Sequence, residues 1–300
     1  MKRLQNNRMI VAPLIGLLLA VFVFGSAIAS EEEAKQAFND GLKAQQEGNL
    51  DAAILQYGAA VRADPNFVDA YINLGTIYFG QKKYDLALSQ FQTAAEKDPK
   101  NADAQANVGR VEYILRRYAE SAAAFKAAIA LDEKNSELYQ ELAKVYYRQQ
   151  NYPDLIATVE KQQTLGGGDY LSLYMLGKAY QKEGNNAKAI DAYKRSVQMK
   201  SDNYSAQFAL GQVYLGQEKY RDAAGAFKAA LKADPEGFRA AYNYAVAMES
   251  LDPESYDANI ANWESFIKIA RKQPKAKSDV AIAQQHVKEL KDTKEKASLQ

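Results

Sequence analysis

The chain has 300 residues, of which 47% are hydrophobic, and its 38 basic residues are almost balanced by 37 acidic ones. A single histidine and the absence of cysteine exclude disulfides, a metal site of the His/Cys type and a Ser-His-Asp catalytic triad. The balanced charge lacks the electrostatic footprint of a nucleic-acid-binding protein, and we expect no cofactor and no enzymatic activity.

The first 29 residues differ in composition from the rest of the chain. Basic residues precede an apolar run over residues 9–24, and a small-residue cleavage site ends at Ala29, ahead of an acidic segment. This order predicts a secretory signal peptide over residues 1–29. The alternative is an uncleaved N-terminal membrane anchor, because residues 9–29 are about long enough to span a bilayer. Both alternatives predict an exported protein, which is periplasmic or secreted in the first case and anchored to the membrane in the second.

From residue 34 onward the sequence repeats with a period of 34 residues. A small residue recurs seven times at this spacing, at position 8 of each repeat when the first repeat begins at Ala34. Its members are Gly41, Gly75, Gly109, Ala143, Gly177, Gly211 and Ala245. Self-similarity at this period is typical of stacked helix-turn-helix repeats, each of which buries its apolar face only against its neighbours.

A second set of positions keeps the same register. Positions 4, 7, 8 and 11 share one face of a first predicted helix, and positions 20, 24 and 27 share one face of a second. The small residue at position 8 lets the two backbones approach, and a ring at position 24 fills the space beside that contact. Position 24 carries Tyr57, Phe91, Phe125, Tyr193 and Phe227. Asp-Pro pairs at Pro65, Pro99 and Pro235 end the second helix, because the residue before proline disfavours the helical conformation.

These positions resemble the tetratricopeptide repeat, whose pattern is W-x2-L-G-x2-Y, then A-x3-F-x2-A, then P. The second repeat matches it with Tyr71, Leu74, Gly75, Tyr78, Ala87, Phe91, Ala94 and Pro99. The resemblance covers most of the chain, about residues 34–271. It implies an all-α fold, a right-handed superhelical solenoid of about seven helix-turn-helix repeats over residues 30–271. It says little about biochemical role, because many systems use the fold as a scaffold.

Two repeats depart from the pattern. Repeat four has Val159 at position 24 and ends in three glycines from Gly166 instead of Asp-Pro. We expect an irregular junction there and not a phosphate-binding loop, since no Lys-Ser/Thr follows. Repeat seven contains about two extra residues near Pro253, after which Trp263 is expected to lie in the core.

One more amphipathic segment follows the last repeat. Its apolar positions are Val280, Ile282, Ala283, Val287 and Leu290. This pattern predicts a capping helix over residues 275–292 that covers the open end of the stack. The charged residues 293–300 are expected to form a frayed tail.

The family resemblance also implies a binding surface, because the first helices of such repeats line a concave groove faced by positions 2, 5, 9 and 12. Cations occupy position 9 in three successive repeats, and aromatic rings occupy position 12 or position 5 in six. The predicted partner-binding residues are Phe79, Arg110, Tyr113, Lys144, Tyr147, Arg148, Tyr174, Lys178, Phe208 and Tyr242. The alternative for the cations is a solvated face, or pairing with acidic neighbours such as Asp103, Glu137 and Glu141.

The sequence therefore predicts a non-catalytic scaffold that binds a protein or peptide partner in this groove, an acidic one if the cations take part. Assembly or stabilisation of a cell-envelope complex is the expected role. The alternative is a binding module for an anionic polysaccharide or another non-protein envelope ligand, which would use the same rings and cations. Contact with a membrane is expected only through residues 9–29, if they are uncleaved.

Overall fold

The computed structural model describes residues 30–299, so the predicted signal peptide or anchor over residues 1–29 lies outside the described residues. Within the described range every regular element is a helix and none is a strand. No helix in that range is long and apolar enough to cross a membrane. The chain divides into two compact modules: the N-terminal module ends at Lys134 and the C-terminal module begins at Asn135.

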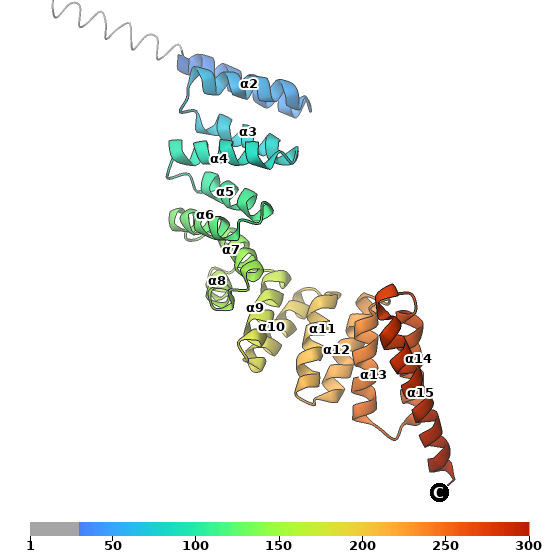
Figure 1. Cartoon of the computed structure of the whole chain (residues 1–300). Coiled ribbons are helices and arrows are strands. Elements are labelled where there is room, and N and C mark those ends of the chain that lie inside the picture. The colour runs from blue at the N-terminus through green and yellow to red at the C-terminus, as the bar shows by residue number, and fades with distance from the viewer. Residues whose placement is uncertain (1–29, 300) are drawn as a thin grey trace, which may run out of the picture. The chain divides into compact units, whose positions relative to one another are not determined.

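The N-terminal module is a succession of helix pairs (Figure 1). Its elements are a helix over residues 30–46, α2 (Leu50–Ala63), α3 (Val68–Gly80), α4 (Tyr84–Lys97), α5 (Ala102–Ile114) and α6 (Tyr118–Leu131). The closest contacts join α3 to α4 and α5 to α6, which are the two helices of repeats two and three. The predicted helix-turn-helix repeats are therefore confirmed in this module.

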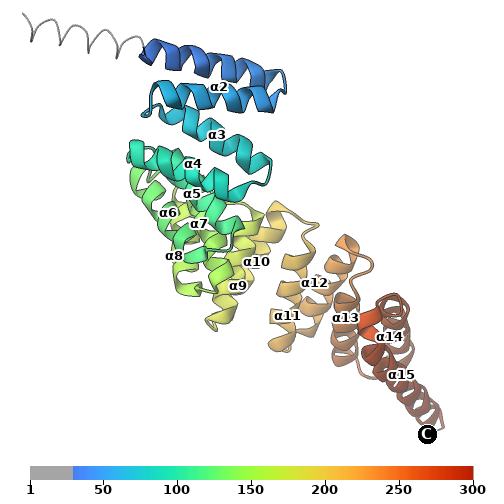
Figure 2. The same ribbon diagram turned by 45° about the horizontal axis from the view of Figure 1, so that its top comes forward.

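The C-terminal module continues the same pairing, as Figures 1 and 2 show. Its elements are α7 (Ser136–Gln149), α8 (Tyr152–Thr164), α9 (Tyr170–Lys182), α10 (Asn186–Met199), α11 (Tyr204–Gly216), α12 (Tyr220–Ala233), α13 (Phe238–Leu251), α14 (Tyr256–Ala270), the 3-10 turn η1 (Pro274–Ala276) and α15 (Lys277–Ser298). The first helices α7, α9, α11 and α13 also contact one another in succession. We call the face formed by these four helices the inner surface of the C-terminal module.

The crossing of the two helices in a repeat depends on the glycine at position 8. A Cβ atom on Gly75 would lie 2.6 Å from the Phe91 ring, and one on Gly211 would lie 2.7 Å from the Phe227 ring. Both separations are shorter than any tolerated carbon contact, so only glycine lets the ring at position 24 sit against the first helix. Repeat four achieves the same crossing with Ala143 because its partner is the smaller Val159, and both are fully buried.

The Asp-Pro pairs end the second helices as predicted. The capping aspartates Asp64, Asp98 and Asp234 all leave the helical conformation, with φ between −127° and −136°. Each carboxylate also accepts a hydrogen bond from the backbone N–H two residues further on, at 2.9–3.0 Å. The side chain thus helps to form the turn that starts the next repeat.

The triple glycine forms a tight loop between α8 and α9. Gly166 and Gly168 have φ values of 74° and 113°, which glycine adopts without steric cost. Gly167 lies against the start of α7, where an added Cβ would come within 2.4 Å of the Ser136 Cβ. The backbone N–H of Gly167 donates to the carbonyl of Gln162 at 3.1 Å, so the irregular junction is a packed turn inside the C-terminal module.

The last helix, α15, packs on α14 and covers the end of the stack. Ala283, Val287 and Leu290 are buried in the same apolar cluster as Trp263, which confirms the expectation that Trp263 belongs to the core. Ile282 differs from the prediction, because its side chain is 63% exposed. It precedes the buried Ala283 by one residue, which is one helical step, and so points away from α14.

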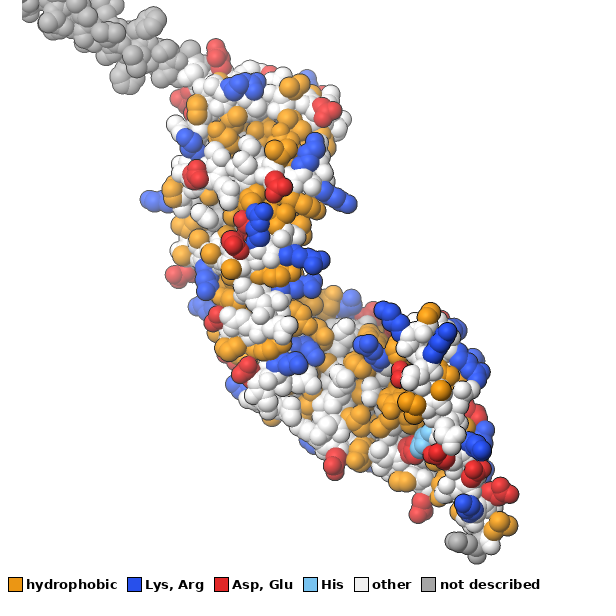
Figure 3. Space-filling model, in the orientation of Figure 1, with side chains coloured by type: hydrophobic (Ala, Val, Ile, Leu, Met, Phe, Trp, Pro, Cys, Tyr) orange, Lys and Arg blue, Asp and Glu red, His pale blue; other side chains and the backbone are white. Residues whose placement is uncertain are grey.

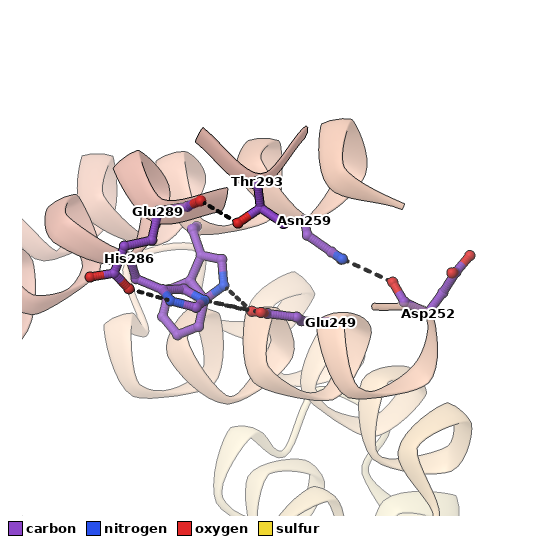
Figure 4. Close-up of polar contacts among 7 residues, drawn as sticks. Glu249, Asp252, Asn259, His286, Glu289 and Thr293 are labelled. Carbon is purple, nitrogen blue, oxygen red and sulfur yellow. Dashed lines mark hydrogen bonds and ion pairs between the residues drawn. The ribbon is translucent and has the colours of Figure 1, made fainter. Parts of the chain in front are cut away.

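Polar contacts fix α15 to α13 as well (Figure 4). Glu249 on α13 accepts a hydrogen bond from the Trp263 indole N–H at 2.7 Å, and the His286 Nε2 lies 2.9 Å from the same carboxylate. The helix then continues to Ser298, beyond the expected end at residue 292, and so includes most of the segment expected to fray. Lys294 contributes to this extension by pairing with Asp257 on α14.

Candidate partner-binding surface

The predicted rings of the N-terminal module pack within their own repeats. Phe79 lies edge-on against Tyr84 with ring centroids 5.7 Å apart, and Tyr113 makes the same contact with Tyr118. In both cases a ring at position 12 of the first helix meets the first residue of the second helix. Arg110 is exposed, and its Nη1 donates to the Asn107 side chain at 2.8 Å.

In the C-terminal module, α7 carries three of the predicted residues. Lys144 is paired with Glu141, with Nζ 2.7 Å from Oε1, as the pairing alternative anticipated. Tyr147 is half-buried and Arg148 is exposed. The cation of Lys144 is therefore partly neutralised by a carboxylate on its own helix.

Three tyrosines meet at the inner surface between α7, α9 and α10. The Tyr174 ring packs on the Tyr193 ring with centroids 6.0 Å apart, and the buried Tyr193 hydroxyl donates to Gln181 at 2.9 Å. Burial, followed by the neighbouring Tyr147 hydroxyl, raises the pKa of Tyr174 to about 12. The Tyr174 phenol is therefore a neutral hydrogen-bonding group at physiological pH.

Lys178 lies one helical turn after Tyr174 on α9, and so on the same face. Its ammonium has no hydrogen bond or ion pair with any residue from 30 to 299. Partial burial, followed by repulsion from Lys182, lowers the pKa of Lys178. Of the three predicted position-9 cations, Lys178 is the half-buried one that lacks a carboxylate partner, so it is the one best placed to receive an anionic group.

Further along the inner surface, rings at position 5 stand directly on the core rings at position 24. Phe208 packs on Phe227 with centroids 5.7 Å apart, and Tyr242 packs edge-on against Trp263 at 5.3 Å. Tyr242 nevertheless remains 39% exposed. The cores of repeats five, six and seven thus each support an aromatic side chain on the inner surface.

Two hollows open on either side of Tyr242 and Ile282. The first, of about 790 Å³, is lined by residues of α11, α13, α14, η1 and α15, including Phe208, Phe238 and the cations Arg239 and Lys275. The second, of about 600 Å³, lies between α13, α14 and α15 and includes Val246, Trp263 and His286. Figure 3 shows this face, with apolar side chains gathered between α13 and α15 beside the pale-blue histidine. We call the two together the terminal hollow.

Volumes of this size match pockets that hold several ligand groups. The hollows combine aromatic rings, the aliphatic side chain of Ile282 and cations at the edge. This combination resembles the anchor sites of protein interfaces, where aromatic residues and arginine are enriched. The surface can therefore hold an apolar side chain in the terminal hollow and an anionic group at Lys178.

Sequence reasoning placed Phe208 and Tyr242 on this surface but missed the contribution of the cap. Ile282, Lys275 and Asp279 come from η1 and α15, which were expected only to cover the stack. The sequence did contain a signal for this contribution. Val246 is at position 9 of repeat seven, and Ile282 lies one 34-residue period plus the two extra residues of that repeat further on, so it has the same place in the repeat. The cap is thus the first helix of an incomplete eighth repeat and extends the inner surface.

Comparison with known families agrees with this architecture. The sequence matches tetratricopeptide repeat models over residues 38–102, 74–136, 106–160 and 208–261, and a further TPR repeat model over residues 177–218. No curated protein matches the chain at the level of sequence.

Several solved structures share the fold. The C-terminal part of a TPR repeat-containing protein from Cytophaga hutchinsonii superposes with a TM-score of 0.64 at 19% identity, over 80% of this chain and 97% of that one. YrrB, described as a TPR protein with an unusual peptide-binding site, gives 0.56 at 21% identity, over 66% of this chain and 97% of that one. PilF of Pseudomonas aeruginosa gives 0.56 at 20% identity, over 72% and 96%.

Proposed function

Since this chain belongs to the tetratricopeptide repeat family, whose fold serves protein–protein interaction, we propose that it binds a segment of a partner protein along the inner surface of its C-terminal module. The observation that carries the proposal is the terminal hollow, an open site of about 790 Å³ and 600 Å³ on the two sides of Tyr242 and Ile282. An apolar side chain of the partner fills this hollow, and catalysis forms no part of the role.

The partner segment is acidic as well as apolar. Lys178 is unpaired within residues 30–299 and half-buried. Arg239 and Lys275 line the larger part of the terminal hollow beside one carboxylate, Asp279, and Glu289 lines the smaller part. A carboxylate bound at Lys178 gains more than it would in water, because the site is partly desolvated. YrrB, a structural neighbour described as peptide-binding, offers a precedent for a peptide ligand on this fold.

The same proposal places the scaffold outside the cytoplasm, in the assembly or stabilisation of a cell-envelope complex. It rests on the basic, apolar and small-residue order of residues 1–29. Intact-mass measurement of protein purified from the native host tests it: a mature chain that begins at Ser30 agrees with cleavage, and a membrane-bound chain that retains Met1 agrees with the anchor. Recovery of the uncleaved chain from the cytosol contradicts both.

A peptide-library selection tests the binding proposal. The full chain is immobilised, and peptides selected from a random library are measured by fluorescence polarisation against Ile282→Asp, which puts a charge into the terminal hollow. We expect affinity to fall at least tenfold, while the fold is unaffected because Ile282 is 63% exposed. The matched control is Met199→Asp on α10, which is 58% exposed in the same module and should bind normally.

The same variants separate the alternative ligand. If no peptide is selected, or both variants bind the peptide equally, the peptide proposal fails. Binding of a sulfated polysaccharide to the wild type that disappears in Ile282→Asp would then assign the terminal hollow to a carbohydrate.

A further inference from the structure

A third groove lies between α14 and α15, separate from the residues of the partner-binding surface. It has a volume of about 580 Å³. Ile267 and Val287 are the apolar residues that line it, and each is only 7% exposed. Its accessible side chains are therefore mainly polar, and they are Glu264, Lys268, Arg271, Gln284, Lys288 and Lys291.

Four of these side chains are cations and one is a carboxylate. Lys291 is paired with Glu264 across the groove, with Nζ 2.8 Å from Oε1. Lys268, Arg271 and Lys288 have no hydrogen bond or ion pair from their side chains to any residue between 30 and 299. The groove therefore keeps three uncompensated positive charges in a chain whose total charge is nearly balanced.

Folding alone explains only part of this arrangement. Lys268 and Arg271 lie at the C-terminal end of α14, where the helix dipole favours positive charge. Lys288 lies in the middle of α15 and has no such support. It is also three residues before Lys291 on the same helix face, where like charges repel. Concentrating these charges between two helices costs stability unless an anion binds among them.

We propose that this groove binds a multiply charged phosphate-bearing anion. Lysine and arginine are the side chains that bind phosphate oxygens most strongly, and the groove supplies both from two different helices. Its volume is within the range of small-molecule sites. A bound anion also ties the cap, α15, to the last complete repeat, so binding stabilises the end of the stack. This site does not depend on the partner-binding proposal, because the two surfaces share no residue.

Calorimetric titration of the full chain with inorganic pyrophosphate tests the proposal. We expect saturable binding of one anion per chain that weakens as salt is raised. The double variant Lys268→Gln with Lys288→Gln should lose at least tenfold in affinity. Its matched control, Lys228→Gln with Lys232→Gln, removes two exposed lysines of α12 and should bind as the wild type does.

A second variant distinguishes a loss of anion binding from a loss of folding, because it is expected to bind more tightly. Glu264→Gln removes the one carboxylate of the groove and frees Lys291, so pyrophosphate should bind severalfold more tightly. Absence of saturable binding to the wild type overturns the proposal, as does equal loss in the two double variants or weaker binding to Glu264→Gln.

Vesicles containing phosphatidic acid, whose phosphate monoester can carry two negative charges, identify the source of the phosphate. Vesicle binding that is competed by pyrophosphate and lost in the Lys268/Lys288 variant indicates a lipid headgroup. Equal vesicle binding by variant and wild type, or none by either, indicates a free anion.

Discussion

Repeats two and three of the N-terminal module and repeats six and seven of the C-terminal module use aromatic side chains on their first helices in different ways. Repeat one resembles the second group, because Phe38 at position 5 packs on the buried Tyr57 ring. In the N-terminal module, Phe79 and Tyr113 stand at position 12 and pack against the tyrosine that begins the second helix of the same repeat. In the C-terminal module, Phe208 and Tyr242 stand at position 5 and rest on the core rings of their repeats. Their outer edges border the terminal hollow.

The difference shows that one repeat pattern supports two roles for a surface ring. At position 12 the ring packs against the second helix and so stabilises the contact between the two helices of a repeat. At position 5 it is held by a buried ring and presented to the inner surface, so stability and binding become coupled. Binding is accordingly expected in the C-terminal module, and substitutions in its core should lower the affinity for the ligand.

The largest expected effect comes from Phe227→Ala. Phe227 is fully buried and supports Phe208, so its loss should cost about 3–5 kcal/mol in the free energy of unfolding. Affinity for a selected peptide should fall too, because Phe208 loses its support. Phe91→Ala in the N-terminal module should cost a similar amount, measured by chemical denaturation, but leave peptide affinity unchanged. Equal loss of affinity in both variants would remove the distinction between the modules.

Gly211→Ala is a smaller perturbation of the same crossing. The added Cβ would lie 2.7 Å from the Phe227 ring, and the resulting strain should cost about 1–3 kcal/mol. Gly216, at the end of the same helix, has no atom within 4 Å of an added Cβ, so Gly216→Ala should be neutral or stabilising by up to about 1 kcal/mol. Thermal unfolding of the two variants distinguishes a steric effect from a general effect of glycine replacement.

The sequence predicted the helical repeats because their registers are set by local and nearest-neighbour packing. Gly75 with Phe91, and Asp98 before Pro99, are enough to define two helices and the turn between repeats. Trp263 was correctly placed in the core once the two extra residues of repeat seven were allowed for.

The candidate site was harder to predict from the sequence than the fold. Position alone did not distinguish Lys178, which is unpaired among the described residues, from Lys144, whose charge is met by Glu141. Pairing depends on rotamers and on the neighbouring helix, which a repeat register does not specify. Ile282 was assigned to the buried stripe because it adjoins Ala283, and one helical step of 100° separates the buried face from the hollow.

The dependence of unfolding stability on pH tests the burial of Tyr174 in the C-terminal module. The pKa of Tyr174 rises to about 12, mainly through burial, whereas an unfolded tyrosine ionises near pH 10. The stabilising contribution is therefore complete below about pH 10 and is lost between about pH 10 and 12, because the unfolded chain releases its proton first. Denaturant midpoints should fall less steeply over this window in Tyr174→Phe than in the wild type. An unchanged slope would mean that Tyr174 is not buried as described.

The smallest effect is expected from Lys178→Gln. Since the ammonium is partly exposed and unpaired within residues 30–299, helicity and unfolding should hardly change. Affinity for an acidic selected peptide should fall by about threefold to tenfold, and its dependence on salt should become flatter. Lys228→Gln on α12 is the control for a general loss of positive charge. If both variants have the same affinity for the peptide, the anion does not bind at Lys178.

Hydrogen exchange of the full chain with and without a selected peptide tests the central claim most directly. If the inner surface of the C-terminal module is the binding surface, protection should increase in α9, α11, α13 and the first half of α15. Exchange in α3 and α5 should stay unchanged although Phe79 and Tyr113 lie on them. Protection of α3 and α5 with no change in α11, α13 and α15 would contradict the account.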